Sequence, residues 1–300
     1  MTGTAWKKLI AYAIIYLVWG STYLAIRIGV AEVPPFLYAA MRFGSAGALL
    51  CAWVVARGER LPGRREWPSI LLLAFLIFVM DYGLLFWAEQ RVPSGLAAVM
   101  LGTIPMFMTF SEIVILKTRR PSAALAVALL AGLAGVAVLT APAGGLGGEP
   151  IDRAGALALI VAALSWSIAT ALSRKLPLPS SELMSSGTQM LVGGAMLALA
   201  AAALGELGRF EPGAVSRSAW LALAYLAIPG SIVAYTAYVW LIKHDSPTRV
   251  GTYAYVNPVV AVLLGWLAGG EPLGLRTVLG TALVLVGVVV ILVTKGRSRH

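Results

Sequence analysis

Ten long apolar segments constrain this chain more than any other feature of its sequence. They centre roughly on residues 18, 46, 78, 104, 131, 164, 194, 230, 260 and 286. Each supplies about 17 to 25 mostly apolar residues, the length that a helix needs to cross a hydrocarbon core of about 30 Å. Runs such as residues 123–139 lack the apolar–polar alternation of a membrane β-barrel. We therefore expect an all-α polytopic membrane protein with ten transmembrane helices.

The basic residues predict the orientation of these helices. A net charge of +10 would suit a nucleic-acid-binding protein, but the charge lies in alternate loops. If the amino terminus is cytoplasmic, 16 of the 23 Lys and Arg residues fall inside and six fall outside, which is the positive-inside pattern. We expect a multi-pass protein of the cell (inner or plasma) membrane, surrounded by lipid, with both termini in the cytoplasm and no nucleic-acid partner.

The two halves of the sequence resemble each other. At a shift of 147 residues Trp19 falls on Trp166, and at a shift of 153 Pro105 falls on Pro258. We divide the chain into two five-helix repeats, residues 1–148 and 149–300. Because five is an odd number, the second repeat enters the membrane from the opposite side. The halves are therefore expected to be inverted around a central cavity.

Pro105 and Pro258 each interrupt a long apolar segment. An interior proline costs a helix about 3 kcal/mol because it removes a hydrogen bond and collides with the preceding turn. Transporters with inverted repeats commonly bind substrate beside interrupted helices near the membrane midplane. We predict that both prolines are hinges beside the cavity, with tolerated kinks as the alternative.

Signatures of catalysis are scarce in this chain. It has one cysteine, Cys51, and two histidines, and it lacks a Walker loop, an HExxH motif and a GxSxG elbow. We expect no enzymatic activity, no cofactor and no metal site. Without a nucleotide site, any transport would use the gradient of the substrate itself or of a coupled ion.

Several stretches resemble the EamA family of the drug/metabolite transporter superfamily. They are WGSTYLAIR (19–27), AAMRF (39–43) and residues 257–292, where a proline, Gly270-Glu271, Gly280 and Gly287 follow in order. The resemblance covers essentially the whole chain and is greatest to YddG-type amino-acid exporters. It implies a carrier with a cavity between its halves. The first repeat lacks the Gly-Glu element, so Glu271 stands alone, and we expect it to be a structural cap.

Two charged residues lie within the predicted membrane core, Arg42 in the second segment and Asp81 in the third. Such residues are costly in the bilayer and are candidates for function. Their predicted depths match, so we expect an ion pair, which would offset much of the cost of burial. A structural lock, a substrate contact and a proton site remain alternatives.

A zwitterionic substrate needs polar contacts that still permit its release. Amides, hydroxyls and indole nitrogens provide such contacts, and aromatic faces can hold an ammonium group. The predicted cavity residues are Trp19, Tyr82, Trp166, Gln189, Tyr235, Tyr253 and Asn257.

These features predict a secondary transporter that exports amino acids or closely related small metabolites by alternating access. The alternative is a proton-coupled efflux carrier for lipophilic cations and drugs. That chemistry needs a carboxylate at the centre of the cavity, and the first and sixth segments have none. Small residues spaced four apart favour close helix packing within one chain. A monomer would suffice, and a homodimer remains open.

Overall fold

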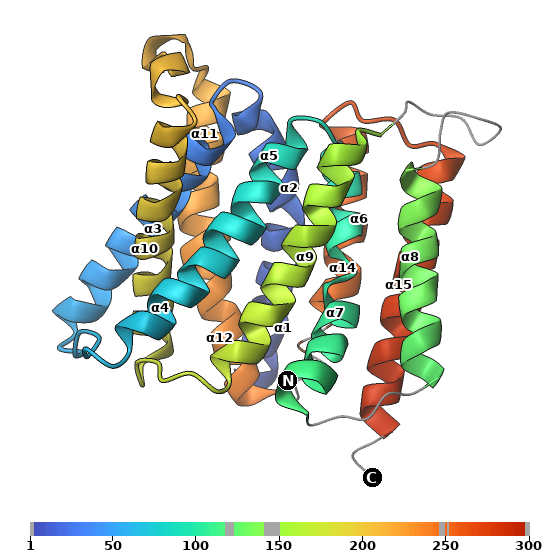
Figure 1. The fold of residues 1–300 in the computed structure, drawn as a ribbon, viewed down its shortest axis with the longest axis horizontal. Helices are drawn as coiled ribbons and strands as arrows, with labels where there is room; N and C mark the ends of the chain where they lie inside the picture. The colour runs from blue at the N-terminus through green and yellow to red at the C-terminus, as the bar shows by residue number, and fades with distance from the viewer. Residues whose placement is uncertain (1–2, 118–122, 141–150, 246–249, 251, 298–300) are drawn as a thin grey trace.

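The computed structural model describes residues 3–117, 123–140, 151–245, 250 and 252–297 as a bundle of helices (Figure 1). Within these residues seven helices are long and apolar enough to cross a membrane, and three shorter apolar helices coincide with the remaining predicted segments. The predicted fold class, an all-α polytopic membrane protein, is confirmed. The predicted boundary between residues 148 and 149 lies outside the described residues.

Several spans of the first half consist of α-helices joined by a π-helical segment. Such a segment adds a residue to a turn and frees main-chain groups, often at functional sites. The elements in chain order are α1 (Gly3–Ala13), a π-helical segment (Ile14–Val18), α2 (Trp19–Val30), α3 (Pro35–Ala56), α4 (Trp67–Ala74), a second π-helical segment (Phe75–Gly83), α5 (Leu84–Glu89), α6 (Ser94–Leu101), α7 (Ile104–Ser111), a third π-helical segment (Glu112–Leu116) and α8 (Ala123–Thr140).

Among the described residues of the second half, a π-helical segment interrupts span eight (Arg217–Tyr238), as one does span three (Trp67–Glu89) of the first half. The first π-helical residues of these two spans, Phe75 and Ile228, are 153 residues apart. The elements of the second half are α9 (Arg153–Ser173), α10 (Glu182–Ala203), two 3₁₀ turns (Leu207–Arg209 and Pro212–Ala214), α11 (Arg217–Ala227), a π-helical segment (Ile228–Val233), α12 (Ala234–His244), α14 (Tyr253–Leu267) and α15 (Leu275–Arg297).

The ends of α3 and α10 follow the sequence repeat. Both boundaries of α10 lie 147 residues after those of α3. Each helix is followed by a glycine in the left-handed region, Gly58 with φ 80° and Gly205 with φ 70°. Glycine tolerates this conformation because it lacks Cβ, and it terminates helices for that reason.

Helices related by the repeat pack against each other. α3 lies along α10, α8 along α15 and α6 along α14, and the first two pairs form opposite edges of the bundle (Figure 1). A Cβ at Gly47 would come within 2.4 Å of the main-chain nitrogen of Leu191, and one at Gly194 within 2.5 Å of that of Gly44. These glycines therefore allow the main chains of α3 and α10 to approach closely.

α2 and α9 occupy the centre between these edges. α2 packs on α11 and α14, and α9 packs on the π-helical segment Phe75–Gly83 and on α7. These contacts follow the repeat. Span one packs on spans eight and nine, and its repeat equivalent, span six, packs on spans three and four. The arrangement brings the middle of α2 and α9 into the interior of the bundle.

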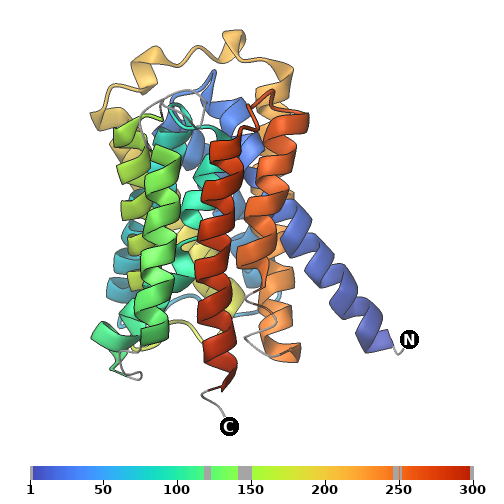
Figure 2. The ribbon, with the colours of Figure 1, turned by 90° about the vertical axis from the view of Figure 1, so that its right-hand side faces the viewer.

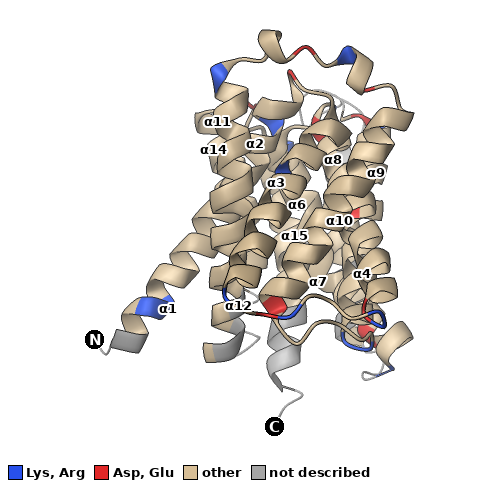
Figure 3. Ribbon diagram, turned by 90° about the vertical axis from the view of Figure 1, so that its left-hand side faces the viewer, with Lys and Arg blue, Asp and Glu red and all other residues tan. Residues whose placement is uncertain are grey.

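Both termini lie at one end of the bundle, and α1 leans away from it there (Figure 2). We call this the terminal end, and it also holds the α9–α10 loop. The opposite, far end holds the loop of residues 204–216. Charged residues concentrate at the two ends of the ribbon, and few lie in the band between them (Figure 3).

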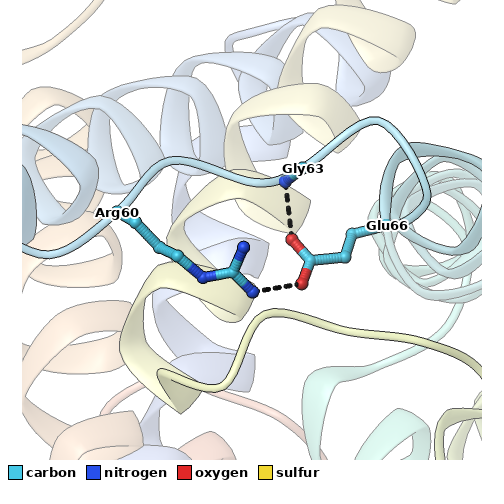
Figure 4. A network of polar contacts seen from close by, with 3 residues as sticks. All are labelled: Arg60, Gly63 and Glu66. Atoms are coloured by element: carbon cyan, nitrogen blue, oxygen red, sulfur yellow. Dashed lines mark hydrogen bonds and ion pairs between the residues drawn. The ribbon is translucent and has the colours of Figure 1, made fainter.

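The loop between α3 and α4 is organised by one carboxylate at the terminal end. Glu66 accepts hydrogen bonds from Nη2 of Arg60 at 2.8 Å and from the main-chain nitrogen of Gly63 at 2.7 Å (Figure 4). All three residues lie outside the spans, so this network serves the loop and not the interior.

Candidate functional site

Two adjoining cavities occupy the interior between the halves. The first has a volume of about 110 Å³ and is lined by residues of spans one, two, three, four, six and nine. The second has a volume of about 330 Å³ and extends to Leu178, Pro179 and Glu182, at the α9–α10 loop of the terminal end. Five side chains line both cavities: Trp19, Arg42, Tyr82, Trp166 and Tyr253.

All the predicted site residues line one or both cavities. The second cavity contains Gln189 and Tyr235. The first cavity contains the remainder, which are Trp19, Arg42, Asp81, Tyr82, Pro105, Trp166, Tyr253, Asn257 and Pro258. The residues chosen from polarity and depth thus converge on one region, although lining a cavity does not assign a role to any of them.

Arg42 is 2% exposed and is held from two sides. Its Nε donates to Oγ of Ser231 at 3.1 Å, and that hydroxyl donates to the main-chain oxygen of Leu226. Its guanidinium carbon lies 4.7 Å from the ring centre of Phe43 and 5.2 Å from that of Tyr82, within the range of cation–π attraction. Nη1 is buried and has no hydrogen-bond partner among the described residues.

Asp81 is 3% exposed and lies in the π-helical segment Phe75–Gly83. Its Oδ1 is buried without a hydrogen-bond partner in the part of the chain that the structure describes. The expected ion pair with Arg42 is wrong for this structure, because the described salt bridges do not join the two. Arg42 turns to Ser231 and the aromatic rings instead. An acidic and a basic side chain therefore line one cavity, each with a polar atom that has no partner among the described residues.

Aromatic rings form much of the cavity wall. Trp19 contacts Tyr238 and Tyr253 with ring centres 5.3 and 5.4 Å apart, and Tyr82 meets Trp166 edge-on at 6.1 Å. The indole nitrogen of Trp19 donates to the main-chain oxygen of Gly230 at 3.1 Å, on the π-helical segment of span eight. These rings offer apolar faces to a ligand, and the Trp19 nitrogen is already engaged.

The predicted amides and the hydroxyl of Tyr235 have partners within the protein. The nitrogen of Gln189 donates to Oγ of Ser185 at 2.9 Å, and Ser186 donates to the hydroxyl of Tyr235. The amide of Asn257, oriented to satisfy its surroundings, donates to the main-chain oxygen of Tyr16, 3.3 Å away. Asn257 therefore links span nine to span one as well as lining the cavity.

The two prolines differ in their surroundings. α14 continues through Pro258. The fourth span is broken at Gly102 and Thr103, and Pro105 follows in the first turn of α7, where a proline is readily accommodated. The halves thus carry equivalent prolines in unlike backbone settings, and the hinge role remains a prediction.

Sequence reasoning missed three residues near the charged groups. Ser231 positions Arg42, and Tyr23 and Tyr238 each line one of the cavities. The Pro229-Gly230-Ser231 sequence inside an apolar segment was the available signal for Ser231. The two tyrosines gave no distinctive signal. Among the described residues, no cluster of three His, Cys, Asp or Glu side chains could hold a metal ion.

At the far end, three carboxylates each join one half to a helix start of the other. Glu271 accepts from the main-chain nitrogens of Ser94 and Gly95, at 2.6 and 2.9 Å, and from the Ser94 hydroxyl. Glu206 accepts from the nitrogen of Leu37 at 2.8 Å at the start of α3. The predicted cap role of Glu271 matches this contact, with α6 as the helix that it caps.

The third far-end carboxylate, Glu32, is exposed. It accepts from the hydroxyl and the main-chain nitrogen of Ser216, both at 2.6 Å, at the start of α11. The hydrogen bond from the Ser216 hydroxyl, followed by that from its main chain, lowers the pKa of Glu32 from its ordinary value. The far end is therefore held together by carboxylates that each accept at least one main-chain hydrogen bond from the other half.

Comparison with known proteins agrees with this architecture. The sequence model of the EamA-like transporter family matches residues 6–141 and again residues 153–293. The chain is 40% identical over 285 residues to the uncharacterized inner membrane transporter YedA of Escherichia coli K12, covering 94% of this chain and 89% of YedA. It is 24% identical over 293 residues to the uncharacterized transporter YoaV of Bacillus subtilis, covering 94% of this chain and 95% of YoaV. A crystal structure with 27% sequence identity aligns with a TM-score of 0.64 over 99% of both chains.

Proposed function

The chain belongs to the EamA-like transporter family, and from this premise we propose that it is a secondary transporter that exports amino acids or closely related small metabolites. The family and its curated relatives are transporters, which fits a carrier and not an enzyme. The substrate class and the similarity to YddG-type exporters are the finer part of this proposal. YedA, described as an inner membrane transporter, supports a location in the cell membrane.

One observation carries the substrate class. A cavity between the halves contains a buried basic side chain, Arg42, and a buried acidic side chain, Asp81, surrounded by aromatic rings. Small-molecule sites combine mostly apolar walls with a few convergent polar groups. A small molecule with both charges and an apolar part, such as an amino acid, is complementary to that lining.

The arrangement suits alternating access. The cavities lead toward the terminal end, and Glu32, Glu206 and Glu271 join the halves at the far end. In the proposed cycle these contacts break as the halves rock and the terminal end closes. We propose inverted halves with both termini in the cytoplasm, and Pro105 and Pro258 as hinges. One chain lines both cavities, so a monomer suffices.

A proton-coupled carrier of lipophilic cations is a second candidate because of Asp81. Sequence reasoning disfavoured this function since spans one and six lack a carboxylate, but Asp81 of span three lines the cavity. Arg42 lines the same cavity and would repel a permanent cation. The repulsion favours amino acids over lipophilic cations.

The test is uptake into proteoliposomes. Purified full-length protein is reconstituted, and radiolabelled alanine, threonine, leucine, phenylalanine and the cation tetraphenylphosphonium are offered with and without a pH gradient. We expect saturable movement of at least one amino acid above empty liposomes. Movement of tetraphenylphosphonium alone would contradict the proposal and favour the second candidate.

A further inference from the structure

We propose that Asp81 and Arg42 are the two polar subsites of a zwitterion-binding site, in which Asp81 receives the ammonium group and Arg42 the carboxylate of an α-amino acid. This inference rests on the proposed function and deepens it. It specifies which side chain of the protein binds each charged group of the substrate.

The Arg42 subsite is preorganised for an anion. Ser231 holds Nε, and the rings of Phe43 and Tyr82 flank the guanidinium group, so its position does not depend on a ligand. Nη1 remains without a partner among the described residues, although Arg42 is 2% exposed. A buried donor on a charged group costs free energy when it is left unpaired, and a carboxylate accepts strong, charge-assisted hydrogen bonds from a guanidinium group.

The Asp81 subsite is suited to a cation with several N–H donors. Oδ1 is buried without a partner in the described part of the chain, while the main chain around Asp81 is π-helical. Glu66, which has a structural role in a loop, receives donors from Arg60 and Gly63, whereas Asp81 combines an unpartnered oxygen with a place in the cavity lining. An ammonium group of the ligand provides the missing donors.

The two subsites act together. Asp81 and Arg42 line one cavity without pairing with each other, so a zwitterion neutralises both without leaving a net charge in the membrane interior. An amine alone would leave Arg42 uncompensated, and a carboxylate alone would leave Asp81 uncompensated. The aromatic wall formed by Trp19 and Tyr82 then favours a neutral, apolar side chain on the amino acid.

The first arm of the test uses the wild-type protein. For the best-transported member of the amino-acid panel, the decarboxylated amine and the deaminated acid are added as competitors. For leucine these are 3-methylbutylamine and 4-methylpentanoate. We expect each to compete at least about tenfold more weakly than leucine, since each forfeits one charge-assisted contact. Equal competition by either analogue would overturn the proposal.

The second arm uses matched variants. Asp81→Asn and Arg42→Gln should each raise the half-saturating substrate concentration about 10- to 100-fold, while Glu66→Gln and Arg60→Gln make the same charge changes outside the cavities and should leave it unaltered. Gel filtration confirms folding, and Arg42→Lys, which keeps the charge, should retain part of the affinity. A variant that does not fold is replaced by Asp81→Glu or Arg42→Lys, which keep the charge; each should give a smaller rise, and no rise would contradict the proposal.

The outcomes separate this inference from the proposed function. If the wild type transports an amino acid and the variants keep its affinity, the zwitterion site is wrong and the transporter proposal stands. If Asp81→Asn keeps the affinity and loses only the response to a pH gradient, Asp81 is a proton site and the inference is overturned. If the wild type moves no amino acid, both proposals fail.

Discussion

Buried carboxylates at the far end and in the central cavity differ in their hydrogen bonding. Glu206 at the far end is 2% exposed, and Asp81 in the cavity is 3% exposed. Glu206 accepts a main-chain hydrogen bond from the start of α3, whereas Oδ1 of Asp81 has no partner among the described residues. Burial is therefore equal, and hydrogen bonding is what differs.

This difference separates stability from function. A buried charge that receives main-chain N–H groups at a helix start stabilises the fold. A buried charge without a partner destabilises it, and proteins retain such groups where a ligand or a reaction requires them. The comparison predicts opposite signs for the same carboxylate-to-amide substitution in the two regions.

Asp81→Asn should give the largest loss of transport. Unlike most substitutions, it should not lower the stability of the protein. Removing an unpartnered charge from the interior should leave the melting temperature unchanged or raise it, while amino-acid transport falls at least about tenfold. Thermal unfolding in detergent and proteoliposome uptake provide the two readouts. A variant that loses stability and transport together would indicate that Asp81 is a structural residue.

Glu271→Gln should give the largest loss of stability at the far end. The amide keeps one acceptor and turns its NH₂ toward donors, so a main-chain nitrogen at Ser94 or Gly95 loses its partner. The loss should be about 1–3 kcal/mol, seen as a lower melting temperature. An unchanged melting temperature would remove Glu271 from the contacts that hold the far end together.

Glu89→Gln tests whether a carboxylate without a hydrogen-bond partner must also line a cavity to take part in substrate binding. Glu89 is fully buried, and neither of its carboxylate oxygens has a hydrogen-bond partner in the described residues, but it lines neither cavity. We expect an unchanged or higher melting temperature and an unchanged substrate affinity. A weakened affinity would show that the absence of a partner identifies functional carboxylates even outside the cavities.

Glu32→Gln should have the smallest effect, because this carboxylate is exposed and its contact is screened by solvent. Its lowered pKa means that the contact is present above the ordinary carboxyl pKa and is lost only as the pH falls through the lowered value. The melting temperatures of wild type and variant should therefore change in parallel between pH 7 and pH 5. A difference that disappears already near pH 6 would contradict this.

Much of the fold was predictable from the sequence because lipid imposes it. Ten apolar segments must become helices. The match between α3 and α10 at a shift of 147 residues extends to their helix boundaries and to the close main-chain approaches at the equivalent glycines Gly47 and Gly194. Uninterrupted periodicity does not reveal π-helical segments, which depend on packing between spans. The Phe75–Gly83 segment was therefore missed.

The sequence predicted which residues line the candidate site, but it did not predict which of them contact each other. Charges are so rare in apolar spans that Arg42 and Asp81 stood out, and both line the cavity. Their depths agreed, but depth does not specify the direction around the helix, and the π-helical turn changes it for Asp81. The Pro229-Gly230-Ser231 sequence marked Ser231 as unusual, but serines are common in membrane helices, and the sequence does not show that Ser231 holds Arg42.

The most direct test of the comparison is the shift in melting temperature that the best-transported amino acid causes in the wild type, Asp81→Asn and Glu271→Gln. Ligand binding to the folded state raises the melting temperature. We expect Glu271→Gln to begin lower than the wild type and to keep the ligand-induced shift. Asp81→Asn should begin at or above the wild type and lose that shift. A retained shift in Asp81→Asn, or a lost shift in Glu271→Gln, would contradict the assignment of ligand binding to the cavity and of structural stabilisation to the far end.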